Sequence, residues 1–125
     1  MADLMGAVKE ALCRPVLKGE EGTWIGFFRF PADFPGFAGH FPAYPILPAV
    51  VQLMAVQAVL EEAQRARPRL LRLERAKFLE RIFPDQEIRV QCRLKEAGEE
   101  KRVEAELTVN GKKAAAFRLG ATWTS

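Results

Sequence analysis

Histidine, tyrosine and cysteine are scarce in this chain. Its 125 residues include one histidine, one tyrosine and two cysteines. Cys13, Cys92 and His40 show no metal-ligand spacing, so we expect neither a bound metal nor a cofactor. A disulfide cannot be inferred from two distant cysteines, and we interpret both as small buried or half-buried thiols.

Long apolar stretches are lacking as well. No segment reaches the roughly 18 uninterrupted apolar residues of a membrane-spanning helix. The start Met1-Ala2-Asp3-Leu4-Met5 has an acid where a secretory signal carries basic residues. We therefore expect a cytoplasmic protein without membrane association. With 49% hydrophobic and 28% charged residues, the chain is typical of one globular domain spanning residues 1–125.

The single histidine, His40, lies in a stretch rich in proline, Gly39-His40-Phe41-Pro42-Ala43-Tyr44-Pro45-Ile46-Leu47-Pro48. Proline fixes φ and disfavours the α conformation in the residue before it, so this stretch is expected to be extended and stiff. Because imidazole exchanges a proton near neutral pH, a rigidly held histidine suits general acid–base catalysis. A lone histidine is often structural or solvated, but its place in a proline, glycine and aromatic loop favours the functional interpretation.

Hydrophobic patterning divides the rest of the chain into one helix and several strands. Residues 23–30 predict a strand, residues 31–47 a long structured loop, and Pro48 the start of a helix that runs to about Ala66. Residues 7–17 are ambiguous. Period-2 alternation predicts further strands near 70–80, 88–94, 103–109 and 113–123. Turns are expected at 97–99 and at Asn110-Gly111. This order predicts an α+β protein in which an antiparallel sheet curls around one helix.

The predicted helix is unusual because its first three turns, residues 49–60, are apolar nearly all round. Only Gln52 and Gln57 interrupt them. A helix of this kind is expected to be surrounded by protein.

Basic residues gather just after the helix. Between Arg65 and Arg81 there are seven arginines and lysines against two glutamates. Such a surface can attract an acidic partner, or it can be a solvated face without one. The segment has one aromatic residue, Phe78, and no nucleic-acid motif, which disfavours nucleic acid as the partner.

The order of elements and the residues around His40 resemble the hot-dog fold of the 3-hydroxyacyl-acyl-carrier-protein dehydratases. The family signature of Gly-His-Phe-Pro, a proline three residues on and Pro-Gly-Val matches Gly39-His40-Phe41-Pro42, Pro45 and Pro48-Ala49-Val50. A weaker similarity covers Ala76-Lys77-Phe78 and Pro84-Asp85-Gln86. The helix start Leu47-Pro48-Ala49-Val50-Val51-Gln52-Leu53 looks similar to relatives in aryl-polyene-type pathways.

The resemblance implies a hydro-lyase that removes water from a 3-hydroxyacyl thioester in fatty-acid or polyene-type synthesis. It implies that His40 transfers protons and that the backbone amide of Ala49 or Val50 polarises the thioester oxygen. It also implies a homodimer with shared sites and an acyl carrier protein as partner. Residues expected at the substrate are Phe37, Gly39, Phe41, Pro42, Tyr44 and Met54. Residues expected to dock the carrier are Arg65, Arg67, Arg69 and Arg72.

One departure from the family is serious. The related enzymes place a glutamate or aspartate fourteen residues after the histidine, where this chain has Met54, which cannot transfer a proton. Gln57, one turn further on, could hydrogen-bond a hydroxyl or a water, or simply the loop backbone. Glu61 lies on the same face but near the solvated end. A non-catalytic acyl-thioester binding or scaffold protein of the same fold therefore remains an alternative. A thioesterase is a third one, disfavoured because the resemblance implies that hot-dog thioesterases also need a carboxylate near the helix.

Overall fold

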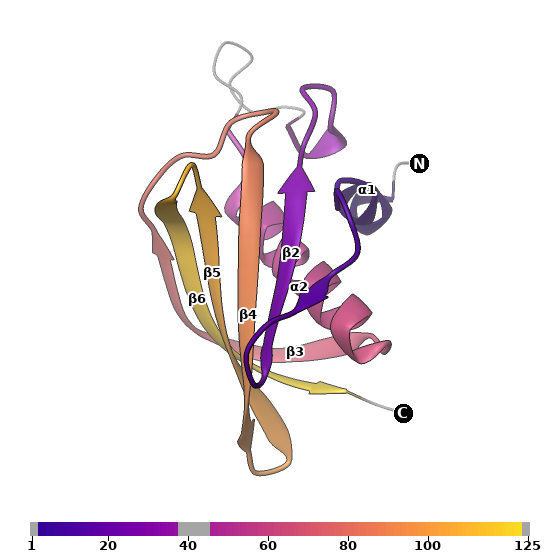
Figure 1. Cartoon of the computed structure of the whole chain (residues 1–125), viewed down its shortest axis with the longest axis vertical. Helices are drawn as coiled ribbons and strands as arrows, with labels where there is room; N and C mark the ends of the chain where they lie inside the picture. Colours follow the sequence, from indigo (N-terminus) through magenta and orange to yellow (C-terminus); the bar gives the residue numbers. More distant parts are fainter. Residues whose placement is uncertain (1–2, 38–45, 124–125) are drawn as a thin grey trace.

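The computed structural model describes residues 3–37 and 46–123 of the chain. Six strands form one antiparallel sheet in the order β1-β2-β4-β5-β6-β3, and the sheet bends around the long helix α2 (Figure 1). The elements are α1 (Leu4–Glu10), β1 (Leu17–Lys18), β2 (Thr23–Arg29), the 3-10 turn η1 (Pro35–Phe37), α2 (Ala49–Gln64), β3 (Pro68–Phe78), β4 (Glu87–Ala97), β5 (Glu100–Val109) and β6 (Lys112–Trp123). The predicted α+β arrangement of an antiparallel sheet around one helix is confirmed.

Both predicted hairpin turns are present. Asn110 and Gly111, between β5 and β6, have φ values of 51° and 78°. Two successive positive φ values are what a type I′ turn requires, and asparagine and glycine tolerate them best. The β4–β5 turn likewise contains Gly98 at φ 75°.

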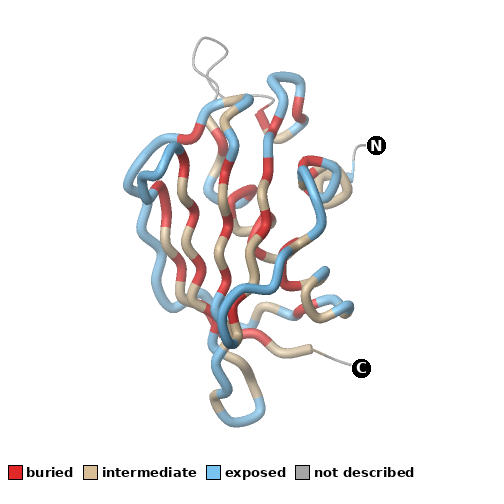
Figure 2. Tube along the Cα trace, in the orientation of Figure 1, coloured by how far each residue is buried: buried red, intermediate tan, exposed pale blue. Residues whose placement is uncertain are grey.

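The core forms between α2 and the face of the sheet toward it. Val56, Val59 and Leu60 of α2 are fully buried, and buried residues alternate with partly exposed ones along β5 (Figure 2). Gly26 on β2 allows the close approach, because a Cβ atom there would lie 2.7 Å from Cγ2 of Val59. The helix is thus held at a short distance from the sheet.

The sheet covers only one side of α2 within a single chain. Val50 is 59% exposed, and Leu53 and Met54 are half-buried. The expectation of a helix surrounded by protein is therefore met on one face only. The edge strand β3 is also open: all of its residues from Leu71 to Phe78 are exposed, including the large apolar Leu71, Leu73 and Phe78.

The two cysteines differ in their exposure. Cys92 is buried as expected, whereas Cys13 is exposed, because it lies beyond α1 in a segment that follows the surface. Both thiols are free. None of the helices within residues 3–37 and 46–123 is both long and apolar enough to cross a membrane.

Candidate functional site

The start of α2 is fixed by its connection to the β3–β4 segment. The amide nitrogen of Leu47 donates to the carbonyl oxygen of Ile82 at 2.8 Å, and both residues are buried. Pro48 is the N-cap, and its carbonyl accepts hydrogen bonds from the amides of Val51 and Gln52, each at 3.1 Å. The first turn of the helix is therefore regular and firmly held.

This geometry leaves two amides at the helix start available for a ligand. The N–H groups of the first turn have no acceptor inside a helix, and they coincide with the positive end of the helix dipole. Pro48 has no N–H, so Ala49 and Val50 supply the first donors, and both residues are exposed. A carbonyl oxygen that gains negative charge would be stabilised there.

Five of the residues predicted at the site lie outside the described residues: Gly39, His40, Phe41, Pro42 and Tyr44. Two residues close to this stretch, Phe37 before it and Leu47 after it, are buried. Phe37 packs edge-on against Phe34, with ring centroids 5.7 Å apart, and Leu47 is in the core. Phe37 therefore anchors the chain just before the histidine motif, and its contact with a substrate stays a prediction.

Met54 and Gln57 lie one turn apart on α2, and both are half-buried. Together with the exposed Val50 they form the side of the helix that the sheet leaves uncovered, which we call the open face of α2. Glu61 is held elsewhere, because its carboxylate accepts a hydrogen bond from Nζ of Lys9 on α1 at 3.0 Å. The described helix thus presents a thioether and an amide, rather than an acid, at the positions corresponding to the family carboxylate and one turn beyond.

Gln52 is a further candidate site residue that the sequence pattern does not identify. Only 4% of it is exposed, its Nε2 donates to the carbonyl oxygen of Leu47 at 3.1 Å, and its Oε1 has no hydrogen-bond partner within the described residues. Its one sequence signal was that it interrupts an apolar helix. A sequence does not show whether such a glutamine is buried, or whether its amide forms all of its hydrogen bonds, because both depend on the fold around it.

The predicted carrier-docking arginines are not equivalent. Arg72 hydrogen-bonds Glu100, and its Nε lies 3.2 Å from Glu74. The hydrogen bond and charge of Glu100, followed by those of Glu74, raise the pKa of the Arg72 guanidinium. Within the described part of the chain, Arg65, Arg67 and Arg69 make no ion pair. These three remain free to meet an acidic surface.

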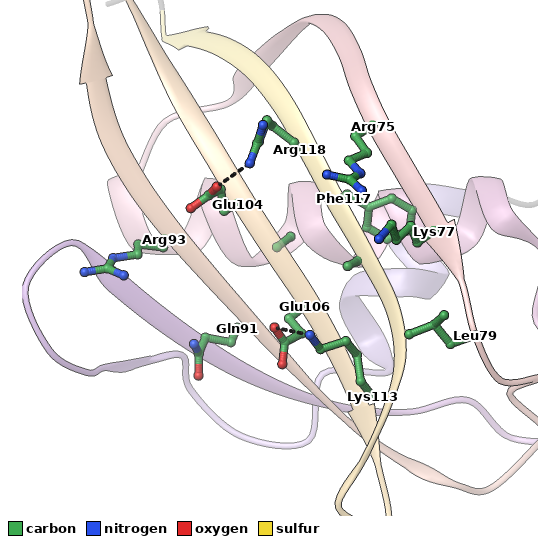
Figure 3. Close-up of a pocket in the computed structure, with 12 residues that line it drawn as sticks. Arg75, Lys77, Leu79, Gln91, Arg93, Glu104, Glu106, Lys113, Phe117 and Arg118 are labelled. Carbon is green, nitrogen blue, oxygen red and sulfur yellow. Dashed lines mark hydrogen bonds and ion pairs between the residues drawn. The ribbon is translucent and has the colours of Figure 1, made fainter.

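A groove of about 420 Å³ lies on the outer face of the sheet, over β3 to β6 (Figure 3). Its lining is strongly charged, and ion pairs join Arg118 to Glu104 at 3.1 Å and Lys113 to Glu106 at 3.4 Å. Glu104 and Glu106 alternate with buried core residues of β5, so the groove faces away from α2. An acyl chain requires apolar lining, and this groove does not match the predicted site.

The described side chains give no support for metal binding, because they include no cluster of three or more His, Cys, Asp or Glu residues.

Burial raises the pKa of the Cys92 thiol to about 12. That thiol is therefore neutral at physiological pH and unsuited to act as a nucleophile.

Comparison with known proteins gives a consistent result. The profile of the ApeI-like family, described as ApeI dehydratase, matches residues 17–118. The 3-hydroxyacyl-acyl-carrier-protein dehydratase FabZ of Streptococcus pneumoniae serotype 4 is 30% identical over 135 residues, which cover 95% of this chain and 96% of that protein.

Solved structures show the same fold at low identity. One chain of the dehydratase heterocomplex ApeI:P from Xenorhabdus doucetiae superposes with a TM-score of 0.71 at 17% identity, covering 86% of this chain and 93% of its own. A hypothetical thioesterase with coenzyme A from Streptococcus pneumoniae gives a TM-score of 0.73 at 8% identity, covering 98% and 95%. These similarities establish the hot-dog fold alone.

Proposed function

The chain belongs to the ApeI-like dehydratase family of hot-dog proteins, related to FabZ, and on this premise we propose that it dehydrates 3-hydroxyacyl thioesters carried by an acyl carrier protein. The observation that carries the proposal is the Gly-His-Phe-Pro motif, followed in the sequence by a helix whose first turn offers the amides of Ala49 and Val50. A cytoplasmic location, without cofactor or metal, is part of the same proposal.

In the proposed reaction His40 removes the proton from C2 of the substrate. The electron pair of that C–H bond forms the C2–C3 double bond as the C3–O bond breaks. An amide of Ala49 or Val50 stabilises negative charge on the thioester oxygen meanwhile. The imidazolium of His40 then returns its proton to the departing hydroxide, which leaves as water. With Met54 in place of the acid, His40 serves as both base and acid.

We also propose that the active form is a homodimer. Three observations support it: the open face of α2 carries the apolar Val50 and Met54, β3 is a free sheet edge, and apolar side chains project from that edge. An unpaired edge strand is a template for pairing with a second strand. Two copies joined through β3 would cover both surfaces and would place Met54 and Gln57 beside the interface. Gln57 could then hold a water near the leaving hydroxyl.

The carrier protein is proposed to dock on Arg65, Arg67 and Arg69, around the end of α2 and the start of β3. Arg72, included in the sequence prediction, is committed to Glu74 and Glu100. It would therefore contribute to the positive field of the surface rather than to a direct contact. Cations of this kind act mainly on the rate of association.

Mass spectrometry of a carrier-linked 3-hydroxyacyl thioester, incubated with the purified protein, would separate the three candidate functions. A dehydratase removes water and, starting from the enoyl thioester, adds it. A thioesterase releases the free carrier thiol. A binding or scaffold protein binds the thioester and leaves it unchanged. The absence of a carboxylate at position 54 argues for this alternative. The proposal requires the first result.

A further inference from the structure

We propose that Gln52 determines specificity for the 3-hydroxyl group, by accepting a hydrogen bond from that hydroxyl through its Oε1. This inference rests on the proposed dehydratase function and deepens it. It assigns a substrate contact to a residue on the buried side of α2 that the family signature around His40 does not include.

The first support is the state of the side chain. Gln52 is 4% exposed and Oε1 has no hydrogen-bond partner in residues 3–37 and 46–123. A buried acceptor without a donor is destabilising, and such groups are rare in folded proteins. The amide orientation is not ambiguous, since Nε2 faces the carbonyl oxygen of Leu47, which can only accept. The free atom is therefore an oxygen that needs a donor.

The second support is where the amide group lies. The hydrogen bond to Leu47, the residue before the N-cap, brings the side chain of Gln52 back to the beginning of α2. Helical side chains lean toward the N-terminus, which favours this direction. The start of the helix thus combines donors, the amides of Ala49 and Val50, with one buried acceptor.

The chemistry of the substrate matches this combination. The thioester oxygen can only accept a hydrogen bond, whereas the 3-hydroxyl can donate one, and the enoyl product has no hydroxyl. Two amide donors and one acceptor could therefore orient the thioester and the hydroxyl together. Because glutamine is neutral at every pH, it positions the hydroxyl while His40 moves the protons. A site that binds a hydroxyl in this way discriminates strongly against analogues that lack it.

Binding measurements in the His40→Ala background test the inference without turnover. The probes are a 3-hydroxyacyl pantetheine thioester and the saturated thioester of equal chain length, each titrated by calorimetry. Replacing Gln52 by methionine, which has similar size and no hydrogen-bonding amide, should weaken binding of the hydroxyacyl probe about tenfold. Binding of the saturated probe should change less than about twofold. Gln64→Met, at the far end of α2, should leave both affinities unchanged.

Gln52→Glu provides a second readout if the methionine variant unfolds. A buried carboxyl has a raised pKa and stays neutral below it. In that form it can donate to Leu47 and still present a carbonyl oxygen. Hydroxyacyl affinity of this variant should be near the wild-type value at low pH and fall as pH rises through the raised pKa, whereas affinity for the saturated probe should vary much less.

The outcomes are distinguishable. Equal losses for both probes, or no preference of the parent His40→Ala protein for the hydroxyacyl probe, would overturn the role of Gln52 and leave the proposed function standing. If the parent protein binds neither thioester, the proposed function and this inference fall together.

Discussion

At the scale of single residues, this chain has Met54 at the position where the related enzymes have a glutamate or aspartate. This difference decides which groups can transfer protons. Removing water from a 3-hydroxyacyl thioester requires a base for one proton and an acid for the hydroxyl. Both carboxylates of α2 lie in its last turn, far from its start: Glu61 pairs with Lys9, and Glu62 accepts a hydrogen bond from the amide of Val16. In the proposed reaction, proton transfer therefore depends on His40, and the neutral groups of Gln52 and Gln57 can only position or polarise the substrate.

Restoring the acid tests this view. Met54→Glu should raise dehydratase activity by about tenfold or more, because a general acid typically contributes at least that much. Met54 is half-buried on the open face of α2, so the carboxyl should be tolerated with its pKa raised. Steady-state kinetics against the carrier-linked substrate would measure the effect.

Met54→Gln is the matched control, since it adds polarity without an acid. Equal activities of the two variants would show that the missing acid does not limit the reaction. A wild type and a Met54→Glu variant that are both folded and inert would favour the binding-protein alternative.

At the scale of elements, the close contact between Gly26 of β2 and Val59 of α2 sets the distance of the helix from the sheet. Gly26→Ala would place a methyl carbon 2.7 Å from Cγ2 of Val59, closer than van der Waals contact allows. We expect a loss of about 1–3 kcal/mol in the free energy of unfolding, because overpacking forces side chains or backbone to shift. Urea denaturation at constant m value would report it.

Gly19→Ala serves as the comparison for that variant. A Cβ atom at position 19 would make only ordinary contacts, 3.5 Å or more from its neighbours, so its effect should stay within about 0.5 kcal/mol. If both substitutions were equally tolerated, Gly26 would not be setting the distance between helix and sheet.

The elements that could be predicted from the sequence are those with one buried face. Ile88, Val90 and Cys92 alternate with polar residues, and β4 was located by that alternation. The edge strand β3 was placed only approximately, because nearly all of its residues are exposed on both faces. The helix α1 was ambiguous since it is seven residues long and buries only Val8.

The site was predictable where its signal is local. The proline at the helix start and the amides after it follow from adjacent residues. The unpartnered oxygen of Gln52 and the pairing of Arg72 with Glu100, 28 residues away, depend on contacts between distant segments. Sequence patterns of period 2 or 3.6 carry no information about such contacts.

At the scale of the whole molecule, the two uncovered apolar surfaces predict self-association. The protein should sediment as a stable dimer at micromolar concentration. Leu73→Glu, in the middle of β3, should shift it to monomers, because a charge would be buried without a partner in the interface.

Leu17→Glu is the control for this test. Leu17 is 52% exposed, close to the 48% of Leu73, but it lies on β1 at the opposite edge of the sheet. Its variant should sediment like the wild type. A wild type that is monomeric at micromolar concentration would contradict both the dimer and the shared site.

The unpaired arginines at the end of α2 predict salt-sensitive capture of the carrier protein. Arg69→Glu should slow association with the carrier-linked substrate several-fold, and the wild-type rate should fall as salt increases. Stopped-flow fluorescence would measure both. Lys112→Glu, the same charge reversal at the β5–β6 turn, should have little effect. If wild type and Arg69→Glu both use carrier-linked and free pantetheine substrates equally well, the surface of Arg65, Arg67 and Arg69 is a solvated face that does not bind the carrier.

In the proposed function, His40 transfers the protons when water leaves a carrier-bound 3-hydroxyacyl thioester. This role can be tested by the rate at which wild-type and His40→Ala proteins interconvert the 3-hydroxyacyl and enoyl thioesters, measured by mass spectrometry in both directions. We predict that the substitution lowers the rate by about 10²-fold or more, with an unchanged circular dichroism spectrum. A His40→Ala protein that retains the wild-type rate would show that His40 is not the proton-transfer residue.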